Sequence, residues 1–171
     1  LKPLWAAWRA LVVARDARGP LELDLPERKI LLKLDGTVDR VVVPERLEAH
    51  RLIEEFMIRA NVAAAEVLEH KRTPLIYRVH EAPSVEKLHG LREVLKTFDI
   101  TLPKQGNLRP GQFNGILARV RGSDAEPLVN EMVLRAQAQA AYDPENVGHF
   151  GLALQRYAHF TSPIRRYADL I

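Results

Sequence analysis

The chain contains no cysteine among its 171 residues. This absence excludes disulfides and thiolate metal sites, and it gives no reason to expect an oxidising compartment. Long apolar runs are missing as well, because the longest are far shorter than the roughly 20 residues that a membrane-spanning helix needs. The N-terminal residues also lack the apolar core of a signal peptide. These absences predict a soluble, cytoplasmic protein without a membrane segment.

Neither sign of charge dominates the sequence. Lysine and arginine number 25 against 22 aspartate and glutamate residues, which leaves a net charge of +3. Such a mild excess permits an anionic partner without requiring one. Apolar residues make up 47% of the chain and can supply the core of one domain or of part of a larger one.

Several motifs that carry chemistry are absent. The sequence has no glycine-rich phosphate loop, no nucleophile elbow and no recognisable Ser/His/Asp order. Its aspartates are scattered, and no two histidines stand four residues apart on one predicted helix; the six are His50, His70, His80, His89, His149 and His159. A magnesium site for phosphoryl chemistry needs clustered carboxylates. From these residues alone we expect no metal site and no complete active site.

Hydrophobic periodicity predicts a mixed α+β fold without an interdomain linker. Helices are expected at Leu4–Ala17, Arg46–His70, from Pro83-Ser84 to about Phe98, and around Gly111–Arg121 and Ala125–Ala140. Strands are expected at Leu21–Leu25, Ile30–Leu34, Val38–Val43, Leu75–His80 and Gly151–Phe160. Asp35-Gly36 is a strong two-residue hairpin turn, so the first three strands should form one β section.

The C-terminal residues hold the most informative motif. Ser162-Pro163 is typical of a helix start, because serine caps the helix and proline fits its first turn. Arg165 and Arg166 follow within one turn, and a helix N-terminus with two added cations suits phosphate. Alternatively, either arginine could simply pair with Asp169. On charge alone, the structural alternative of a pair with Asp169 is slightly favoured. Because the chain ends inside this motif, we expect it to be a fragment.

A second polar feature lies on the long predicted helix. Glu54 and Asn61 are seven residues apart, so they project from the same side and flank an apolar stripe. Glu54 could point into a cleft and accept a hydrogen bond from a ligand hydroxyl. It could equally lie at a solvated helix edge or form a structural ion pair, and spacing alone favours this second interpretation.

The ordered motifs closely resemble those of the ribonuclease II/ribonuclease R exoribonuclease family. The sequence HFTSPIRRYAD at His159–Asp169 resembles the signature of that family. Further segments resemble the bacterial version in the same order, namely His50–Asn61, Arg78–Ser84 and Tyr142–Gln155. Similarity extends from about residue 4 to residue 171, so it concerns nearly the whole chain.

The resemblance implies processive degradation of single-stranded RNA from the 3′ end, with Mg²⁺-assisted hydrolysis to 5′-mononucleotides. It implies that residues 1–171 are the central to C-terminal part of a catalytic domain, truncated at both ends. On this resemblance, we expect the 171 residues to include neither the family's cold-shock domains nor its C-terminal OB-fold RNA-binding domain. The family's magnesium-binding aspartates form a cluster that this chain lacks, so the metal ligands should lie outside it and the fragment should be inactive.

The resemblance also implies roles for individual residues. Arg165 matches the family's catalytic arginine, which would bind the scissile phosphate and stabilise charge that develops on it. Glu54 matches a glutamate that contacts the 3′-terminal nucleotide. Four further residues belong to the signature and would shape the RNA site: His159, Ser162, Arg166 and Tyr167. One departure is Leu23, which falls near an aromatic position of the family and cannot stack on a base as phenylalanine does.

Two other hypotheses remain open. The chain could be a non-catalytic RNA-binding or protein-interaction module that retains the exoribonuclease fold, or an unrelated basic α+β domain. An aspartate cluster in the sequence upstream would favour the enzyme, and its absence would favour the binding module. A truncated domain also exposes faces that its missing parts would cover, so oligomers of the fragment could be artefacts of truncation.

Overall fold

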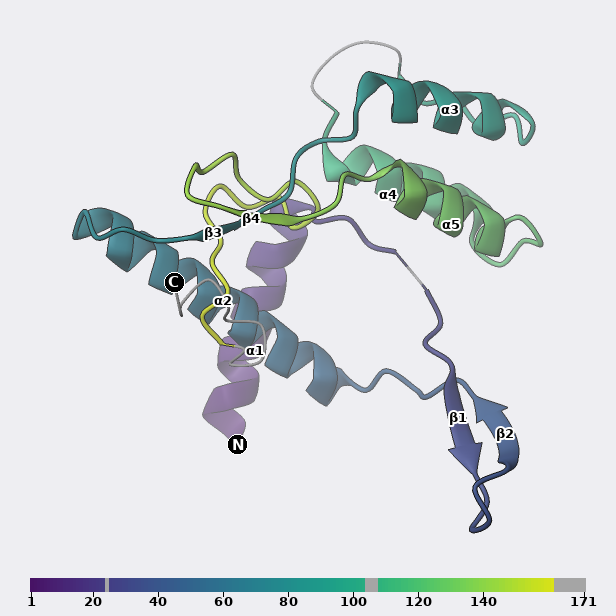
Figure 1. Cartoon of the computed structure of the whole chain (residues 1–171), viewed down its shortest axis with the longest axis horizontal. Helices are drawn as coiled ribbons and strands as arrows, with labels where there is room; N and C mark the ends of the chain where they lie inside the picture. Colours follow the sequence, from purple (N-terminus) through teal and green to yellow (C-terminus); the bar gives the residue numbers. More distant parts are fainter. Residues whose placement is uncertain (24, 104–107, 162–171) are drawn as a thin grey trace.

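The computed structural model describes residues 1–23, 25–103 and 108–161 of the chain (Figure 1). Helices and short strands alternate irregularly in this part, which confirms the mixed α+β class. The helices are α1 (Lys2–Arg18), α2 (Glu48–His70), α3 (Val85–Lys96), α4 (Pro110–Val120) and α5 (Glu126–Ala136). The strands are β1 (Lys29–Leu32), β2 (Val38–Val42), β3 (Tyr77–Val79) and β4 (Ala141–Asp143).

Helices α3, α4 and α5 pack side by side and enclose the main hydrophobic core (Figure 1). Its fully buried members include Phe113 on α4, Leu95 on α3, and Val129 and Val133 on α5. As predicted, Ser84 caps α3, because its hydroxyl accepts a hydrogen bond from the Lys87 amide at 3.3 Å. The largest fully buried side chains among the described residues all lie in this layer.

The long helix α2 crosses α1 and lies beside the small ladder of β3 and β4 (Figure 1). Strands β3 and β4 are antiparallel, with Tyr77 opposite Asp143 and Val79 opposite Ala141. Two smaller apolar clusters connect α2 to this ladder and to the segment that follows β4. The C-terminal signature therefore begins next to α2, away from the three-helix layer.

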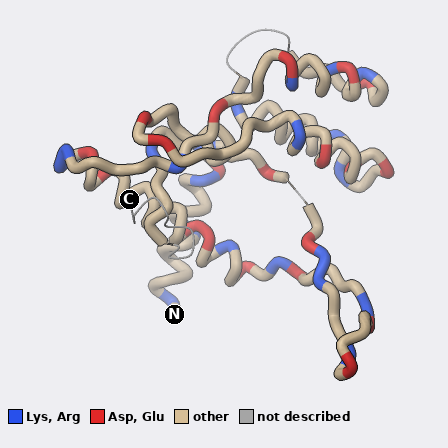
Figure 2. The backbone as a smooth tube through the Cα atoms, in the orientation of Figure 1, with Lys and Arg blue, Asp and Glu red and all other residues tan. Residues whose placement is uncertain are grey.

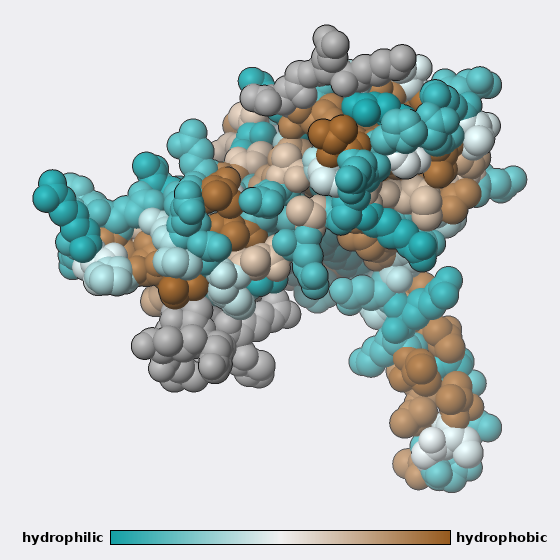
Figure 3. Space-filling model, turned by 45° about the horizontal axis from the view of Figure 1, so that its top comes forward, coloured by the Kyte–Doolittle hydropathy of each residue, from teal (hydrophilic) through white to brown (hydrophobic). Residues whose placement is uncertain are grey.

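The predicted hairpin at Asp35-Gly36 is confirmed, although its loop is longer than two residues. The Lys33 amide donates to the Thr37 carbonyl at 2.8 Å, and of Asp35 and Gly36 only the glycine has a positive φ, of 81°. Asp35 instead accepts hydrogen bonds from the amide and hydroxyl of Thr37. Strands β1 and β2 project from the body and carry exposed apolar side chains (Figures 1 and 3).

Two predicted strands are wrong. The sequence at 21–25 alternates in polarity, but its described residues, 21–23 and 25, are not part of any strand. Single hydrogen bonds hold this segment instead: the Leu21 amide donates to the Gly151 carbonyl at 2.8 Å, and the Glu22 amide donates to Oδ1 of Asn114 at 2.9 Å. Residues 151–160 form turns and irregular chain, with Ala153 at a φ of 52°.

The predicted helix at Ala125–Ala140 is too long by four residues. Gln137 takes an extended backbone conformation and ends α5, and its side-chain amide donates back to the Val133 carbonyl at 2.9 Å. Residues 137–140 have no regular secondary structure, and β4 begins directly after them at Ala141. Periodicity did not predict this strand. The other four helices begin and end within two residues of their predicted bounds.

Charges of both signs are interspersed along the helices and the hairpin (Figure 2). Within the described ranges, no helix combines the length and the apolar character that crossing a bilayer requires.

Candidate functional site

Four of the six residues predicted for the site lie outside the described residues, namely Ser162, Arg165, Arg166 and Tyr167. The two that the structure describes are Glu54 and His159. The structure therefore defines the first three residues of the signature, His159 to Thr161, and the side chains that hold them in place.

A single buried side chain on α2 holds the start of the signature. Asn61 is 3% exposed, and its Oδ1 accepts hydrogen bonds from the backbone amides of Phe160 at 2.8 Å and Thr161 at 3.0 Å. The Thr161 hydroxyl adds a third contact at 3.2 Å. Through Nδ2, Asn61 also donates to the Tyr157 hydroxyl at 3.0 Å. One amide thus links α2 to the segment on both sides of His159.

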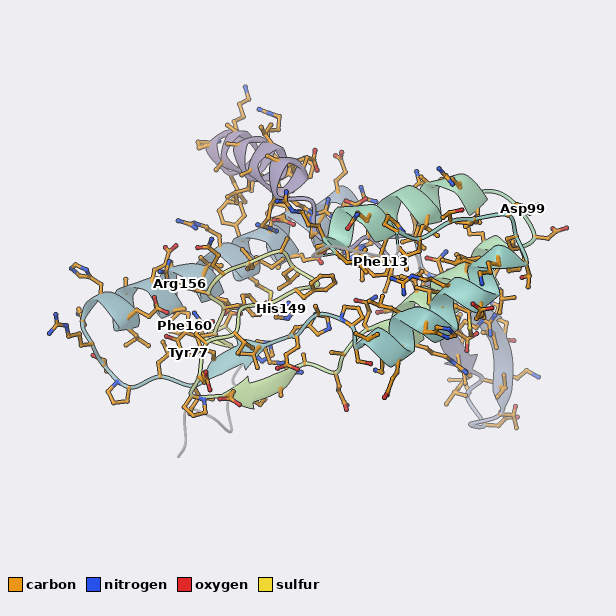
Figure 4. The ribbon with its side chains drawn as sticks, turned by 90° about the horizontal axis from the view of Figure 1, so that it is seen from above. Tyr77, Asp99, Phe113, His149, Arg156 and Phe160 are labelled. Atoms are coloured by element: carbon orange, nitrogen blue, oxygen red, sulfur yellow. The ribbon has the colours of Figure 1, made fainter. Side chains whose placement is uncertain are left out.

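His159 lies in a row of ring contacts. Its Nδ1 and the Tyr142 hydroxyl form a hydrogen bond of 2.7 Å. The centroid of its ring lies 5.8 Å from that of the Tyr157 ring. The row continues from Tyr157 to His149, with ring centroids 5.3 Å apart, and from His149 to His80, with ring centroids 5.0 Å apart. Figure 4 shows His149 and Phe160 on the same side of the molecule, beside α2. These contacts connect β3, β4 and the signature.

The two inner histidines of this row, His80 and His149, have different surroundings. Nδ1 of His80 accepts from the Gly151 amide at 2.8 Å, while Nε2 lies 2.9 Å from the Ala138 carbonyl, so only the form with a proton on Nε2 satisfies both partners. Burial, and then the neighbouring His80, lower the pKa of His149 to about 4. His149 therefore has a packing role at neutral pH.

This lowered pKa predicts that acid weakens the fold. The unfolded chain binds a proton at His149 near pH 6.5, whereas the folded chain binds it only near pH 4. The stabilisation is complete above pH 6.5 and is lost as the pH falls towards 4. Between pH 7.5 and 5 we expect His149 to account for a loss of about 1–2 kcal/mol in unfolding free energy, after allowance for partial exposure.

Urea unfolding of the wild type, His149→Gln and His89→Gln at the two pH values tests this. The exposed His89 is the matched control and should leave the pH dependence unchanged. A His149→Gln variant with the full wild-type pH dependence would show that His149 does not cause it.

Glu54 and Asn61, the polar pair predicted on α2, lie in two different environments. Asn61 is buried, but the side chain of Glu54 is 48% exposed and pairs with Arg46. Glu54 lies nearer the N-terminal end of α2, which extends away from the packed body (Figure 1). Its surroundings match the alternative of a helix edge with an ion pair, and its contact with RNA stays a prediction.

The buried carboxylate on this helix belongs to the next residue. Glu55 is 6% exposed and pairs with Nε of Arg15 at 3.1 Å, with Arg18 4.0 Å away. Burial raises the pKa of Glu55, although both guanidiniums oppose this shift. Burial likewise lowers the pKa of Arg18. Glu55 joins α2 to α1 and is a structural residue that spacing did not distinguish from Glu54.

Leu23, the residue near the family's aromatic position, is partly buried against the core of α3, α4 and α5. Its packing gives it a structural role in this part of the chain. The residues that line a hollow of about 540 Å³ include His80, Arg109, His149 and Gln155. Of the predicted site residues that the structure describes, neither Glu54 nor His159 lines it.

Among the residues that the structure describes, no three His, Cys, Asp or Glu side chains are grouped so that they could hold one metal ion. The described part of this chain therefore does not fit a magnesium site.

Comparison with known proteins decides the family. The RNB domain matches residues 1–171, the full length of the chain. The chain belongs to the RNB domain family. Ribonuclease R of Escherichia coli (strain K12) is 41% identical over 170 residues, and ribonuclease R of Aquifex aeolicus is 43% identical over 171 residues.

A solved structure supports the same assignment. RNase R of Mycoplasma genitalium, in complex with ribose-methylated single-stranded RNA, superposes with a TM-score of 0.88 at 30% identity over 99% of this chain. The RNB segment spans only part of each relative: 21% of the Escherichia coli protein, 24% of the Aquifex aeolicus protein and 27% of the Mycoplasma genitalium chain.

Sequence reasoning missed most of the residues around the signature. It noted Asn61 only as a partner of Glu54, and it gave Tyr142, Tyr157 and Phe160 no role. One signal was available, because an asparagine within the apolar stripe of a helix needs hydrogen-bond partners when it is buried. The identity of those partners, almost 100 residues away in sequence, could not be read from local spacing.

Proposed function

We propose that this chain is part of a processive 3′-to-5′ exoribonuclease that hydrolyses single-stranded RNA to 5′-mononucleotides in the cytoplasm. Residues 1–171 would be the central to C-terminal part of its catalytic domain. The observation that carries the proposal is the RNB match over all 171 residues, together with about 40% identity to ribonuclease R proteins. An intact HFTSPIRRYAD signature supports it further.

Arg165 is the proposed catalytic residue. A guanidinium is permanently charged and presents several N–H donors in a planar fork, which fits the oxygens of a phosphodiester. In phosphoryl transfer, charge spreads over the oxygens around phosphorus, and fixed cations stabilise the transition state. We propose that Arg165 supplies this charge during hydrolysis.

The remaining site residues would hold the RNA. Glu54 would accept a hydrogen bond from the 3′-terminal nucleotide, and its pair with Arg46 would have to open or rearrange for this contact. Four residues of the signature would shape the site around the scissile phosphate: His159, Ser162, Arg166 and Tyr167. For His159 the described contacts with Tyr142 and Tyr157 support an orienting role at the edge of the site.

We also propose that the exoribonuclease uses Mg²⁺, held by carboxylates outside this chain. When bound, the ion would supply charge neutralisation at the phosphate and activate water. The grouping needed for such a site is missing among the described carboxylates and histidines. The 171-residue chain alone should therefore bind RNA weakly and leave it intact.

Product analysis tests the proposal. The full-length protein, incubated with Mg²⁺ and a 5′-labelled RNA carrying a single-stranded 3′ extension, should release 5′-mononucleotides progressively from the 3′ end. Under the same conditions the 171-residue chain should release none. Internal cleavage, or no hydrolysis by the full-length protein, would contradict the proposed function and favour a non-catalytic binding module. Mononucleotide release by the short chain would contradict the placement of the metal ligands.

A further inference from the structure

We propose that Asn61 is a positioning residue for RNA hydrolysis, because it fixes the backbone of the signature at Phe160 and Thr161. The inference rests on the proposed function, and it concerns a residue on α2 that lies more than 100 positions before Arg165. Its basis is a set of hydrogen bonds between described residues, all made by one carboxamide group.

The acceptor side of this amide serves the signature directly. Oδ1 of Asn61 accepts hydrogen bonds from the backbone amides of two consecutive residues, Phe160 at 2.8 Å and Thr161 at 3.0 Å. Two such bonds to one oxygen fix both the position and the direction of the backbone, since a single bond would allow rotation. The Thr161 hydroxyl, at 3.2 Å, adds a side-chain contact to the same oxygen.

The donor side of the amide holds the group in place. Nδ2 of Asn61 donates to the Tyr157 hydroxyl at 3.0 Å, and Tyr157 is itself 8% exposed and packed against Ile58 and Val62 of α2. The orientation of the carboxamide is thereby set, with its oxygen towards the signature. Asparagine suits this place because it combines an acceptor and a donor in one short planar group.

We call the hydrogen bonds from Phe160 and Thr161 to Asn61 the clamp. The clamp lies close in sequence to the proposed catalytic residue. Arg165 follows Thr161 by only four residues. A displacement of the backbone at Phe160 and Thr161 would therefore be passed on to the proposed catalytic guanidinium. A misplacement of about 1 Å can cost about 100-fold in rate, even when its cause lies away from the reacting atoms. Loss of the clamp should thus lower turnover more than RNA binding.

The competing explanation is that Asn61 only stabilises the fold. A second buried asparagine provides the matched control. Asn130 on α5 is 2% exposed and donates through Nδ2 to the Glu126 carbonyl at 2.9 Å. It lies in the three-helix layer, away from the signature. Replacement of either asparagine should reduce stability, but only replacement of Asn61 should slow hydrolysis by folded molecules.

The experiment uses the full-length protein and a single-stranded 3′-extended RNA, with rates corrected for the folded fraction. We expect Asn61→Leu, which is close in size but has no hydrogen-bonding group, to lower kcat about 100-fold with KM within about 3-fold of the wild type. Asn61→Asp keeps the acceptor and should recover at least about 10-fold of this loss. Asn130→Leu should keep kcat within about 3-fold of the wild type.

Amide hydrogen exchange gives a readout that does not depend on activity. In the wild type the amides of Phe160 and Thr161 should be protected. Asn61→Leu should remove the protection of the Thr161 amide, while Asn130→Leu keeps it. The Phe160 amide also donates to the Ala158 carbonyl at 3.0 Å and should lose only part of its protection. If Asn61→Leu does not fold, Asn61→Ser takes its place, because its shorter side chain cannot reach both amides, and the same losses are expected.

The inference is overturned if folded Asn61→Leu turns over within about 3-fold of the wild type, if Asn130→Leu loses as much kcat, or if kcat falls while both amides stay protected. Failure of the proposed function would look different. In that case the wild-type protein would release no mononucleotides, whereas failure of this inference alone would leave an active wild type that Arg165→Ala inactivates and Asn61→Leu does not.

Discussion

Replacement of Arg165 by alanine in the full-length protein should lower kcat by about 1,000-fold or more, with RNA affinity within a few-fold of the wild type. The reason is that a guanidinium placed at a transferring phosphoryl group is worth about 10³–10⁵ in rate, because it meets charge that develops in the transition state. The many other contacts that hold RNA would remain. Single-turnover hydrolysis and equilibrium binding, measured on the same RNA, separate the two effects.

Two further variants sharpen this test. Arg165→Lys keeps the charge but loses the planar fork, so it should be intermediate, with most of the deficit retained. Arg119→Ala removes an exposed arginine at the C-terminal end of α4 and serves as the matched control, with unchanged turnover. An Arg165→Ala protein that hydrolyses RNA at the wild-type rate would remove this residue from the mechanism.

The largest expected effect on stability concerns Phe113. Its side chain is fully buried in the core of α3, α4 and α5 (Figure 4). Its ring also packs edge to face against that of Phe150, with the two ring centroids 6.2 Å apart. Phe113→Ala removes a large apolar group and leaves a cavity that the three helices can fill only in part. We therefore expect a loss of about 3–5 kcal/mol in the free energy of unfolding.

Urea unfolding of the 171-residue chain measures this loss. Leu134→Ala is the control, because Leu134 lies on α5 in the same layer but is 44% exposed. Its replacement should cost less than about 1 kcal/mol. Equal losses for Phe113→Ala and Leu134→Ala would show that the three-helix layer is not a close-packed core.

The sequence allowed the helices to be predicted well, because each buries one apolar face and the 3.6-residue period is strong over 11 residues or more. The hairpin was equally accessible from Asp35-Gly36. Strand β4 was not, because three residues are too few for a period and, among the described strands, it pairs only with the equally short β3. The segments predicted as strands at 21–25 and 151–160 alternate in polarity, but contacts that a local pattern does not encode decide their structure. Leu21 and Glu22 make single hydrogen bonds to distant groups, and Leu154 turns back to pair with His149.

The candidate site shows the same division. The signature and Glu54 were found because their residue types stand in a fixed order along the chain. The clamp at Asn61 was missed because it depends on a contact between α2 and residues almost 100 positions later. Glu54 and Glu55 differ only in which way the helix turns each side chain, and packing against Arg15 decides that Glu55 is the buried one.

The central claim is that the Arg165 guanidinium binds the phosphodiester that is cut. A crystal structure of the full-length protein with a non-cleavable RNA tests it most directly. We expect N–H···O distances of about 2.7–2.9 Å between Arg165 and oxygens of the scissile phosphate. An Arg165 side chain held in a purely structural contact, out of reach of that phosphate, would contradict the account.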